Sequence, residues 1–152
     1  MDSETAKNLR ELSKYLLANP ELAFKEYLAH DACVKFIKEN CDGWQITPHA
    51  YGLETAWEAL YTQGQNGRRI VFCSEYDALP DLGHACIVLY DCFDFMIGGH
   101  NLICVGGIGA AISAVNKLKQ HPEVTGEVVI LGTPAEEGSG SSTRNVYHSV
   151  SL

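Results

Sequence analysis

Side chains that can bind a metal ion or transfer a proton gather in three short segments of the sequence. In chain order, the segments contribute Glu75 and Asp77, then His84, Cys86 and His100, and finally Glu136 and Glu137. Thiolate, imidazole and carboxylate groups together are the usual ligands of zinc in proteins. The residue types therefore indicate a metal site assembled from three loops.

The adjacent carboxylates Glu136 and Glu137 suit metal-assisted hydrolysis, because one can bind a cation while the other accepts a proton from water. An isolated Glu-Glu pair is more often the first turn of a surface helix, where acidic groups interact favourably with the helix dipole. The pair follows an apolar run and Thr133-Pro134, however. Ligands of open α/β sheets gather outside the carboxyl ends of strands, so this position favours the catalytic interpretation.

The spacing of apolar residues predicts the elements that position these segments. Recurrence every three or four residues predicts helices over residues 3–17, 23–40 and 102–119. Ser3 is expected to cap the first helix. The third helix carries glycines at positions 106, 107 and 109, which would let it pack closely on a sheet.

Three segments have the composition of β-strands. They span residues 56–62, 69–73 and 126–131. Turn residues between the first two strands, over 64–67, favour a hairpin. Helices interleaved with short apolar strands indicate an α/β fold with layered architecture.

Composition excludes several classes of protein. With 152 residues, 46% hydrophobic and 20% charged, the chain is expected to form one domain rather than a disordered, coiled-coil or collagen-like protein. The net charge of −8 and the lack of a basic cluster make nucleic acid and anionic membranes poor partners.

The start of the chain and its cysteines indicate a compartment. The N-terminus lacks a basic region followed by an apolar core, and no run of eighteen apolar residues occurs, so neither export nor a membrane span is expected. We therefore expect a cytoplasmic protein. Its six cysteines are then expected to be free thiols or metal ligands rather than disulfides.

Four strings, in this order, resemble the zinc-dependent metallopeptidase family twenty of aminoacylases, dipeptidases and carboxypeptidases, above all its dipeptidase and amidohydrolase branch. The strings are EYDALP at 75–80, GHAC at 83–86, GHNLI at 99–103 and GTPAEEG at 132–138. Further matches at 17–24 and 52–56 extend the resemblance from residue 8 to about 140. The resemblance implies a three-layer α/β fold, a mixed sheet with helices on both faces, that forms the N-terminal part of a zinc-exopeptidase-like catalytic domain.

The resemblance also implies a reaction and a role for each site residue. The reaction would be hydrolysis of the amide bond of a small dipeptide or N-acyl amino acid. Cys86, His100 and Glu137 would bind Zn²⁺, or another divalent metal such as Mn²⁺ or Co²⁺. Glu136 would be the general base, and Asp77 would orient a ligand or bridge at the metal.

Two features of the metal motif depart from the family pattern. Residues 87–98, an apolar and aromatic insert, separate Cys86 from Gly99, and their deletion restores a continuous His-Ala-Cys-Gly-His string. The insert is interpreted as untranslated sequence kept in frame or as an alternative splice form. Glu75 stands where other branches place a histidine ligand, which leaves open whether one metal or two are bound.

The resemblance assigns residues 1–140 to a partial catalytic domain and leaves 141–152 as an unmatched tail. The lid or dimerisation domain of family members is absent, so a homodimer is expected only of a full-length parent and the hydrolytic activity of this chain is expected to be impaired. The alternative is a non-catalytic remnant that folds partially or associates with a full-length subunit.

The remaining cysteines, histidines and acids have weaker or purely structural interpretations. A replacement ligand set of Asp91, Cys92 and Asp94, or a redox pair of Cys86 with Cys92, is least favoured, because no geometry or Cys-x-x-Cys spacing supports either. Structural roles are expected for His30, His49 and the thiols Cys33, Cys41, Cys73 and Cys104, whereas for His84 a core role and a role at the site are equally open.

Overall fold

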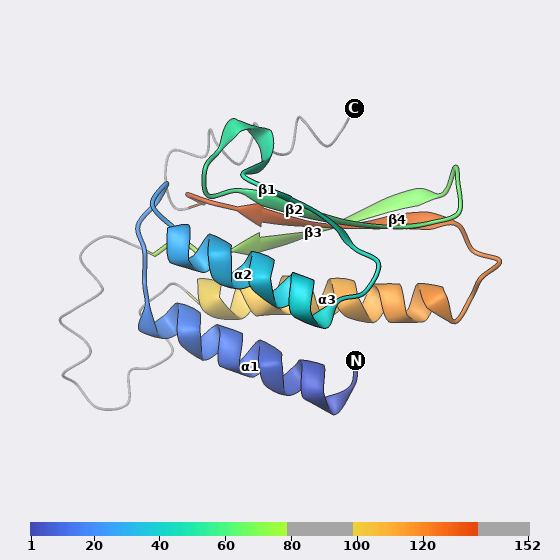
Figure 1. Cartoon of the computed structure of the whole chain (residues 1–152), viewed down its shortest axis with the longest axis horizontal. Coiled ribbons are helices and arrows are strands. Elements are labelled where there is room, and N and C mark those ends of the chain that lie inside the picture. The colour runs from blue at the N-terminus through green and yellow to red at the C-terminus, as the bar shows by residue number, and fades with distance from the viewer. Residues whose placement is uncertain (79–98, 137–152) are drawn as a thin grey trace.

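A four-stranded mixed sheet with three long helices packed on one side forms the body of the computed structural model, which describes residues 1–78 and 99–136 (Figure 1). The helices are α1 (Ser3–Ala18), α2 (Tyr27–Asn40) and α3 (His100–Lys119), and η1 (Ala50–Gly52) is a short 3-10 turn. The strands are β1 (Gln45–Pro48), β2 (Trp57–Gln63), β3 (Arg68–Glu75) and β4 (Gly126–Thr133). The predicted α/β fold with a mixed sheet is confirmed.

The sheet has the strand order β1-β2-β4-β3, with β3 parallel to β4 and the other pairs antiparallel. The predicted hairpin of β2 with β3 is therefore wrong, since β4 lies between them. Strand β4 is apolar on both faces: Ile130 packs in the helix-side core, and Leu131 packs in the opposite cluster. Such a strand is stable only when it is covered on both sides, so it takes a central place in the sheet.

The link between β2 and β3 passes directly over the start of β4. A Cβ atom on Gly67 would lie 2.1 Å from the carbonyl oxygen of Thr125, the residue just before β4. Gly64 has a φ of +71°, and a Cβ there would lie 2.5 Å from the Thr125 side chain. Residues 64–67 do form a turn, as predicted, but the turn carries the chain from β2 past β4 to β3 instead of pairing β2 with β3.

All three helices of the described residues lie on the same face of the sheet, whereas helices on both faces were predicted (Figure 1). Helices α2 and α3 contact the sheet directly, and α1 packs on them. The other face is covered by residues around η1: Tyr51 and Leu53 pack against Val129 and Leu131. Among the described residues, the cluster on this face is small, and the short segment around η1 covers it.

The helices begin at other residues than the apolar spacing predicts, or are capped by other residues. Asp2 rather than Ser3 caps α1, accepting a hydrogen bond of 2.8 Å from the Thr5 N–H. Helix α2 begins at Tyr27 instead of residue 23, because Phe24 has a left-handed backbone (φ 62°). Helix α3 begins at His100, two residues before its predicted start.

The glycines of α3 serve different purposes. A Cβ on Gly107 would lie 2.2 Å from the carbonyl oxygen of Cys73 in β3, so this glycine allows the predicted close packing on the sheet. Gly109 faces Leu9 of α1, and Gly106 faces open space. By length and composition α3 could cross a membrane, and 33% of its apolar window is buried. The buried part, which includes Ile108, Ala111 and Val115, belongs to the core that α3 forms with α1 and the sheet.

The cysteines and histidines of the core behave largely as expected. Cys33 and Cys104 are fully buried thiols whose Sγ atoms lie 3.5 Å apart, whereas Cys41 and Cys73 are half-buried. His30 is buried in α2 and stacks on the ring of His49 at 4.5 Å between centroids.

Candidate metal centre

The parallel pairing of β3 with β4 brings three polar segments to one edge of the sheet. Glu75 ends β3 and is paired with Thr133 at the end of β4. Helix α3 starts at the same edge with His100, and Glu136 lies three residues beyond β4. The carboxyl ends of parallel strands and a helix N-terminus therefore converge there, as in other open α/β sheets.

The His100 imidazole is held by Asp77. Nδ1 lies 3.0 Å from the Asp77 carboxylate oxygen Oδ1 and 2.9 Å from its carbonyl oxygen. Because both partners are acceptors, Nδ1 carries the proton and donates it. The neutral ring then presents the lone pair of Nε2, the arrangement that orients metal-binding histidines in proteins.

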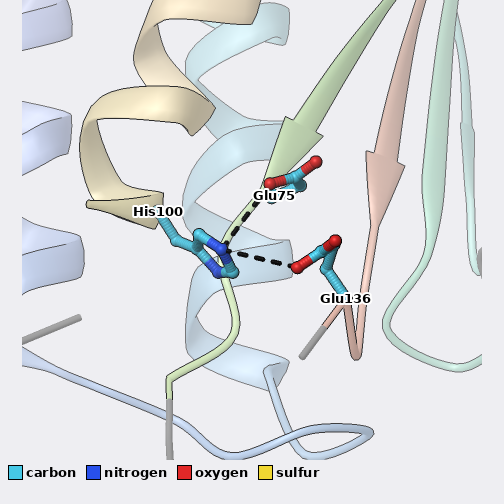
Figure 2. Close-up of side chains that lie close together, drawn as sticks. All are labelled: Glu75, His100 and Glu136. Atoms are coloured by element: carbon cyan, nitrogen blue, oxygen red, sulfur yellow. Dashed lines mark ion pairs between the residues drawn. The ribbon is translucent and has the colours of Figure 1, made fainter. Parts of the chain in front are cut away.

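Two carboxylates face that lone pair. Nε2 of His100 lies 3.6 Å from Oε2 of Glu75 and 3.8 Å from Oε2 of Glu136 (Figure 2). One ligand atom from each of the three residues lies within 4.8 Å of the others. Ligand atoms about 2.1 Å from a tetrahedral cation stand about 3.4 Å apart. The donor set and its spacing thus fit a divalent cation.

Charge around the imidazole favours a cation at this position. His100 and Asp77 are buried, with 4% and 0% of their surface exposed, while Glu75 and Glu136 are partly accessible. The hydrogen bond that His100 donates to Asp77 raises the pKa of His100 to about 9, and this rise exceeds the lowering caused by burial. A metal ion must displace a proton from this ring to bind, so metal uptake should increase with pH.

The same hydrogen bond predicts how the stability of the metal-free protein depends on pH. Because the folded-state pKa of about 9 exceeds the ordinary value of 6.5, the protonated ring stabilises the fold fully below pH 6.5. That contribution should be lost as the pH rises through 9. Thermal unfolding in the presence of a chelator should therefore show a falling midpoint over this range, and a smaller fall in Asp77→Asn. Equal pH dependence in the two proteins would contradict the assignment.

The structure brings together part of the predicted site. His100, Asp77 and Glu136 meet at the sheet edge. The predicted ligands Cys86 and Glu137 lie outside the described residues, as do the insert 87–98 and the remaining side chains considered for it, His84, Asp91, Cys92 and Asp94. Their roles remain predictions.

Glu75 belongs to the side chains at strand exits that can bind a metal, but the resemblance gives it no ligand role. Its carboxylate is one of the two that face Nε2 of His100. The signal was its place at the exit of a strand, two residues before Asp77. Strand alternation puts residues 75 and 77 on the same face, and so within reach of one ring.

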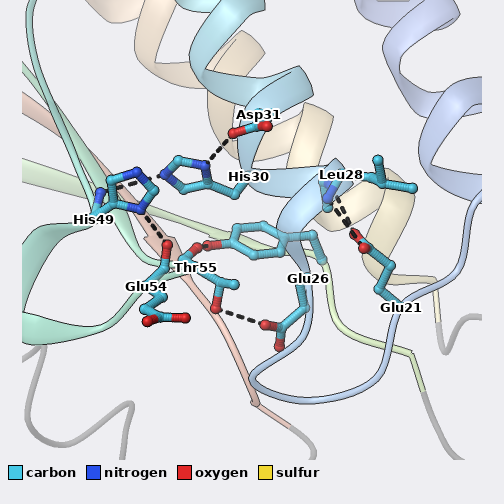
Figure 3. A network of polar contacts seen from close by, with 10 residues as sticks. Glu21, Glu26, Leu28, His30, Asp31, His49, Glu54 and Thr55 are labelled. Atoms are coloured by element: carbon cyan, nitrogen blue, oxygen red, sulfur yellow. Dashed lines mark hydrogen bonds and ion pairs between the residues drawn. The ribbon is translucent and has the colours of Figure 1, made fainter.

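Glu26 is a second carboxylate that sequence reasoning missed. It is fully buried beside the site and accepts a hydrogen bond from Thr55 (Figure 3). It also accepts one from the backbone N–H of Ala135. Burial raises the pKa of Glu26, and the hydrogen bonds it accepts offset part of that rise. In the sequence it is one acid next to Lys25 in the mostly apolar segment 22–28, and only the fold reveals its partners.

Comparison with known proteins gives relatives of one kind. No model of a known protein family matches the chain. The chain is 37% identical over 149 residues to the mouse Xaa-Arg dipeptidase and 36% identical to the human Xaa-Arg dipeptidase. Each match covers 90% of this chain but 31% of the relative, so the chain spans about a third of the length of these curated relatives.

Two solved structures share the fold. A dinuclear metal-binding peptidase of the M20 family from Bacillus subtilis superimposes with a TM-score of 0.73 at 23% identity, covering all of this chain and 41% of that one. A Staphylococcus aureus protein described as an aminohydrolase superimposes with a TM-score of 0.64 at 22% identity, covering 91% of this chain and 36% of that one. The chain therefore has the mixed α/β fold found in part of a solved M20 peptidase.

Proposed function

We propose that this chain carries the metal-binding edge of a metal-dependent dipeptidase or amidohydrolase of metallopeptidase family M20. The observation that carries the proposal is the convergence of Glu75, His100 and Glu136 around one point, with Asp77 holding the imidazole. The mouse and human Xaa-Arg dipeptidases and the M20-peptidase fold support the same reading.

The chain's own residues divide the work of hydrolysis by this proposal. His100 and Glu75 would hold the cation, with Cys86 and Glu137 as further ligands. Bound there, a divalent cation would supply the Lewis acidity that polarises the scissile carbonyl. Glu136, whose carboxylate is 41% exposed, would take a proton from the attacking water and pass it to the leaving amine. Asp77 would keep the proton on Nδ1 throughout.

The substrate class follows from the relatives and from the chemistry of the site. We propose dipeptides, those with a C-terminal arginine among them, or N-acyl amino acids, with Zn²⁺ as the metal and Mn²⁺ or Co²⁺ as alternatives. We also propose a cytoplasmic location, since the described thiols Cys33, Cys41 and Cys104 are not in disulfides. A homodimer is proposed only for a longer parent protein.

The insert between Cys86 and His100 provides the sharpest test. Metal content and hydrolysis of Xaa-Arg dipeptides and N-acyl amino acids should be measured for the full chain and for a variant lacking residues 87–98. The deletion restores the Cys-Gly-His spacing, so we expect it to bind about one zinc ion per chain more tightly than the full chain by about tenfold or more. Glu136→Gln in the deleted form should keep its zinc and lose turnover.

The result also separates the enzyme from a non-catalytic remnant. Hydrolysis that requires both metal and Glu136 supports the proposal. Absence of metal from both forms would contradict it and favour a remnant that acts only by association with a longer subunit. Loss of zinc in Glu136→Gln would instead make Glu136 a ligand and overturn its assignment as the base.

A further inference from the structure

A buried carboxylate joins three distant parts of the chain beside the candidate metal centre. Oε1 of Glu26 accepts hydrogen bonds of 2.9 Å from both the Phe24 N–H and the Ala135 N–H, and Oε2 accepts one of 2.8 Å from the Thr55 hydroxyl. Glu26 is 0% exposed, and Figure 3 shows its carboxylate next to Thr55. Among the described residues it has no partner charge, which is unfavourable for a buried carboxylate, so its hydrogen bonds must do something that an apolar side chain could not.

What these hydrogen bonds hold is an uncommon backbone conformation. Ala135 has a φ of 58°, in the left-handed region that residues with a side chain rarely adopt. Ala135 directly precedes Glu136, so its backbone angles decide where the Glu136 carboxylate points. Phe24, the other residue bonded to Oε1, has a φ of 62°. Both left-handed residues therefore donate their N–H groups to the same oxygen atom.

The segment that carries Glu26 also holds the other loop of the site. The carbonyl oxygen of Glu21 accepts a hydrogen bond of 2.8 Å from the N–H of Ala78, and Leu22 forms an isolated bridge with Ala78. Ala78 follows Asp77, the residue that orients His100. Residues 21–26 thus bind both loops of the site. The Glu21 backbone bonds to the loop after β3, and the Glu26 carboxylate bonds to the loop after β4.

We propose that Glu26 is a positioning residue of the metal centre, which fixes the backbone before Glu136 through the hydrogen bond from Ala135 to Oε1. This inference rests on the proposed function, because it assigns Glu26 a role in holding a site for a cation. Glu26 does not belong to the cluster of Glu75, His100 and Glu136 and contacts the loop after β4 through the backbone of Ala135. Its contribution is geometric, because it fixes the backbone from which the Glu136 carboxylate extends. Without this hydrogen bond the carboxylate would be free to turn away from the site.

Two variants of Glu26 and one matched control test the proposal. Glu26→Ala removes the acceptor, whereas Glu26→Gln keeps Oε1 for both N–H groups and lets Thr55 accept in place of donating. Glu21→Ala is the control. The Glu21 carboxylate caps α2 at the Leu28 and Ala29 N–H groups, at 3.1 and 2.9 Å, but its bond to Ala78 is made by the backbone and survives the substitution.

The first measurement needs no metal. Hydrogen exchange of the Ala135 amide, followed by NMR on the metal-free chain, should accelerate by about tenfold or more in Glu26→Ala, because the amide loses its acceptor. It should stay close to the wild-type rate in Glu26→Gln and in Glu21→Ala. A folded Glu26→Ala protein with unchanged exchange at Ala135 would overturn the proposal.

The second measurement reads the metal site directly. The backbone that Glu26 fixes at Ala135 leads through Glu136, the base, to Glu137, the ligand proposed above. Co²⁺ affinity, obtained by competition with a chelator, should therefore fall by about tenfold to a hundredfold in Glu26→Ala, and the visible absorption of bound Co²⁺ should change with the coordination geometry. The Glu26→Gln protein should regain both the affinity and the spectrum. Unchanged Co²⁺ binding together with faster Ala135 exchange would show that the loop is held for another reason, and would also overturn the proposal.

The two readouts keep the failure of this inference apart from the failure of the proposed function. If the wild-type chain binds no Co²⁺, the metal site itself is refuted and Glu26 cannot be a positioning residue for it, whatever the exchange at Ala135. If Glu26→Ala does not fold, Glu26→Gln decides. If the Ala135 amide of Glu26→Gln stays protected from exchange, hydrogen bonds to residue 26 hold the loop, as proposed. If a folded Glu26→Gln protein loses this protection, the proposal is overturned.

Discussion

Replacement of His100 by Ala should lower the affinity of the chain for Zn²⁺ by about a hundredfold or more, because it removes the ligand around which the site is built. Nε2 of His100 is the atom that both Glu75 and Glu136 face, at 3.6 and 3.8 Å. Without the ring, the two carboxylates and Asp77 would remain as acids without a shared nitrogen donor. Competition with a chromogenic chelator would measure the loss.

His121→Ala is the matched control for this experiment. It removes an imidazole that lies just beyond the far end of α3 and pairs with Glu123 on the surface, at 3.1 Å. Zinc affinity in this variant should equal that of the wild-type chain. The assignment of His100 would be refuted by a folded His100→Ala protein that still binds zinc as tightly as the control.

Substitution of Gly107 by Ala should destabilise the fold by about 2–3 kcal/mol, the cost typical of overpacking a closed contact. The added Cβ would meet the carbonyl oxygen of Cys73 at 2.2 Å, and a backbone atom of a strand paired along its length with β4 cannot turn aside. Helix α3 would have to move away from β3. Since His100 lies two turns earlier on the same helix, zinc affinity should fall as well. Urea denaturation of the metal-free protein would measure the loss of stability.

The neighbouring glycine supplies the comparison. Gly106 faces open space, so Gly106→Ala should be neutral or stabilise the protein by up to about 1 kcal/mol through helix propensity alone. Opposite effects at adjacent positions would separate packing from propensity. Similar effects for the two substitutions would mean that α3 does not press on β3 at Gly107.

The predicted elements depend on local patterns, and most of them are found in the structure. Apolar spacing located all three helices and the central strand β4, because burying one face of a helix requires a regular period in the sequence. The helix starts were less accurate. Their positions depend on groups such as Asp2, which caps α1, and Glu26, which holds Phe24 out of the helical region.

The pairing of strands could not be predicted from local patterns. Turn residues 64–67 favoured a hairpin, yet β4, more than fifty residues later, separates β2 from β3. A glycine-rich turn has the same local sequence whether it reverses a strand onto its neighbour or crosses a third one. The choice is made by the burial of β4 on both faces, which depends on every element packed around it.

By itself the sequence determined which groups are available for chemistry: the carboxylates at strand exits, the imidazole at the start of α3 and the fold class that joins them. The tertiary structure alone decided that Glu75 faces the same nitrogen of His100 as Glu136, that Asp77 fixes the proton on that ring, and that Glu26 holds the loop behind them. The physical reason is distance along the chain. Residues 26, 75, 100 and 136 have no local period in common. The parallel pairing of β3 with β4 brings residues 75 and 136 to one edge, and the bonds of His100 to Asp77 and of Ala135 to Glu26 bring the other two there.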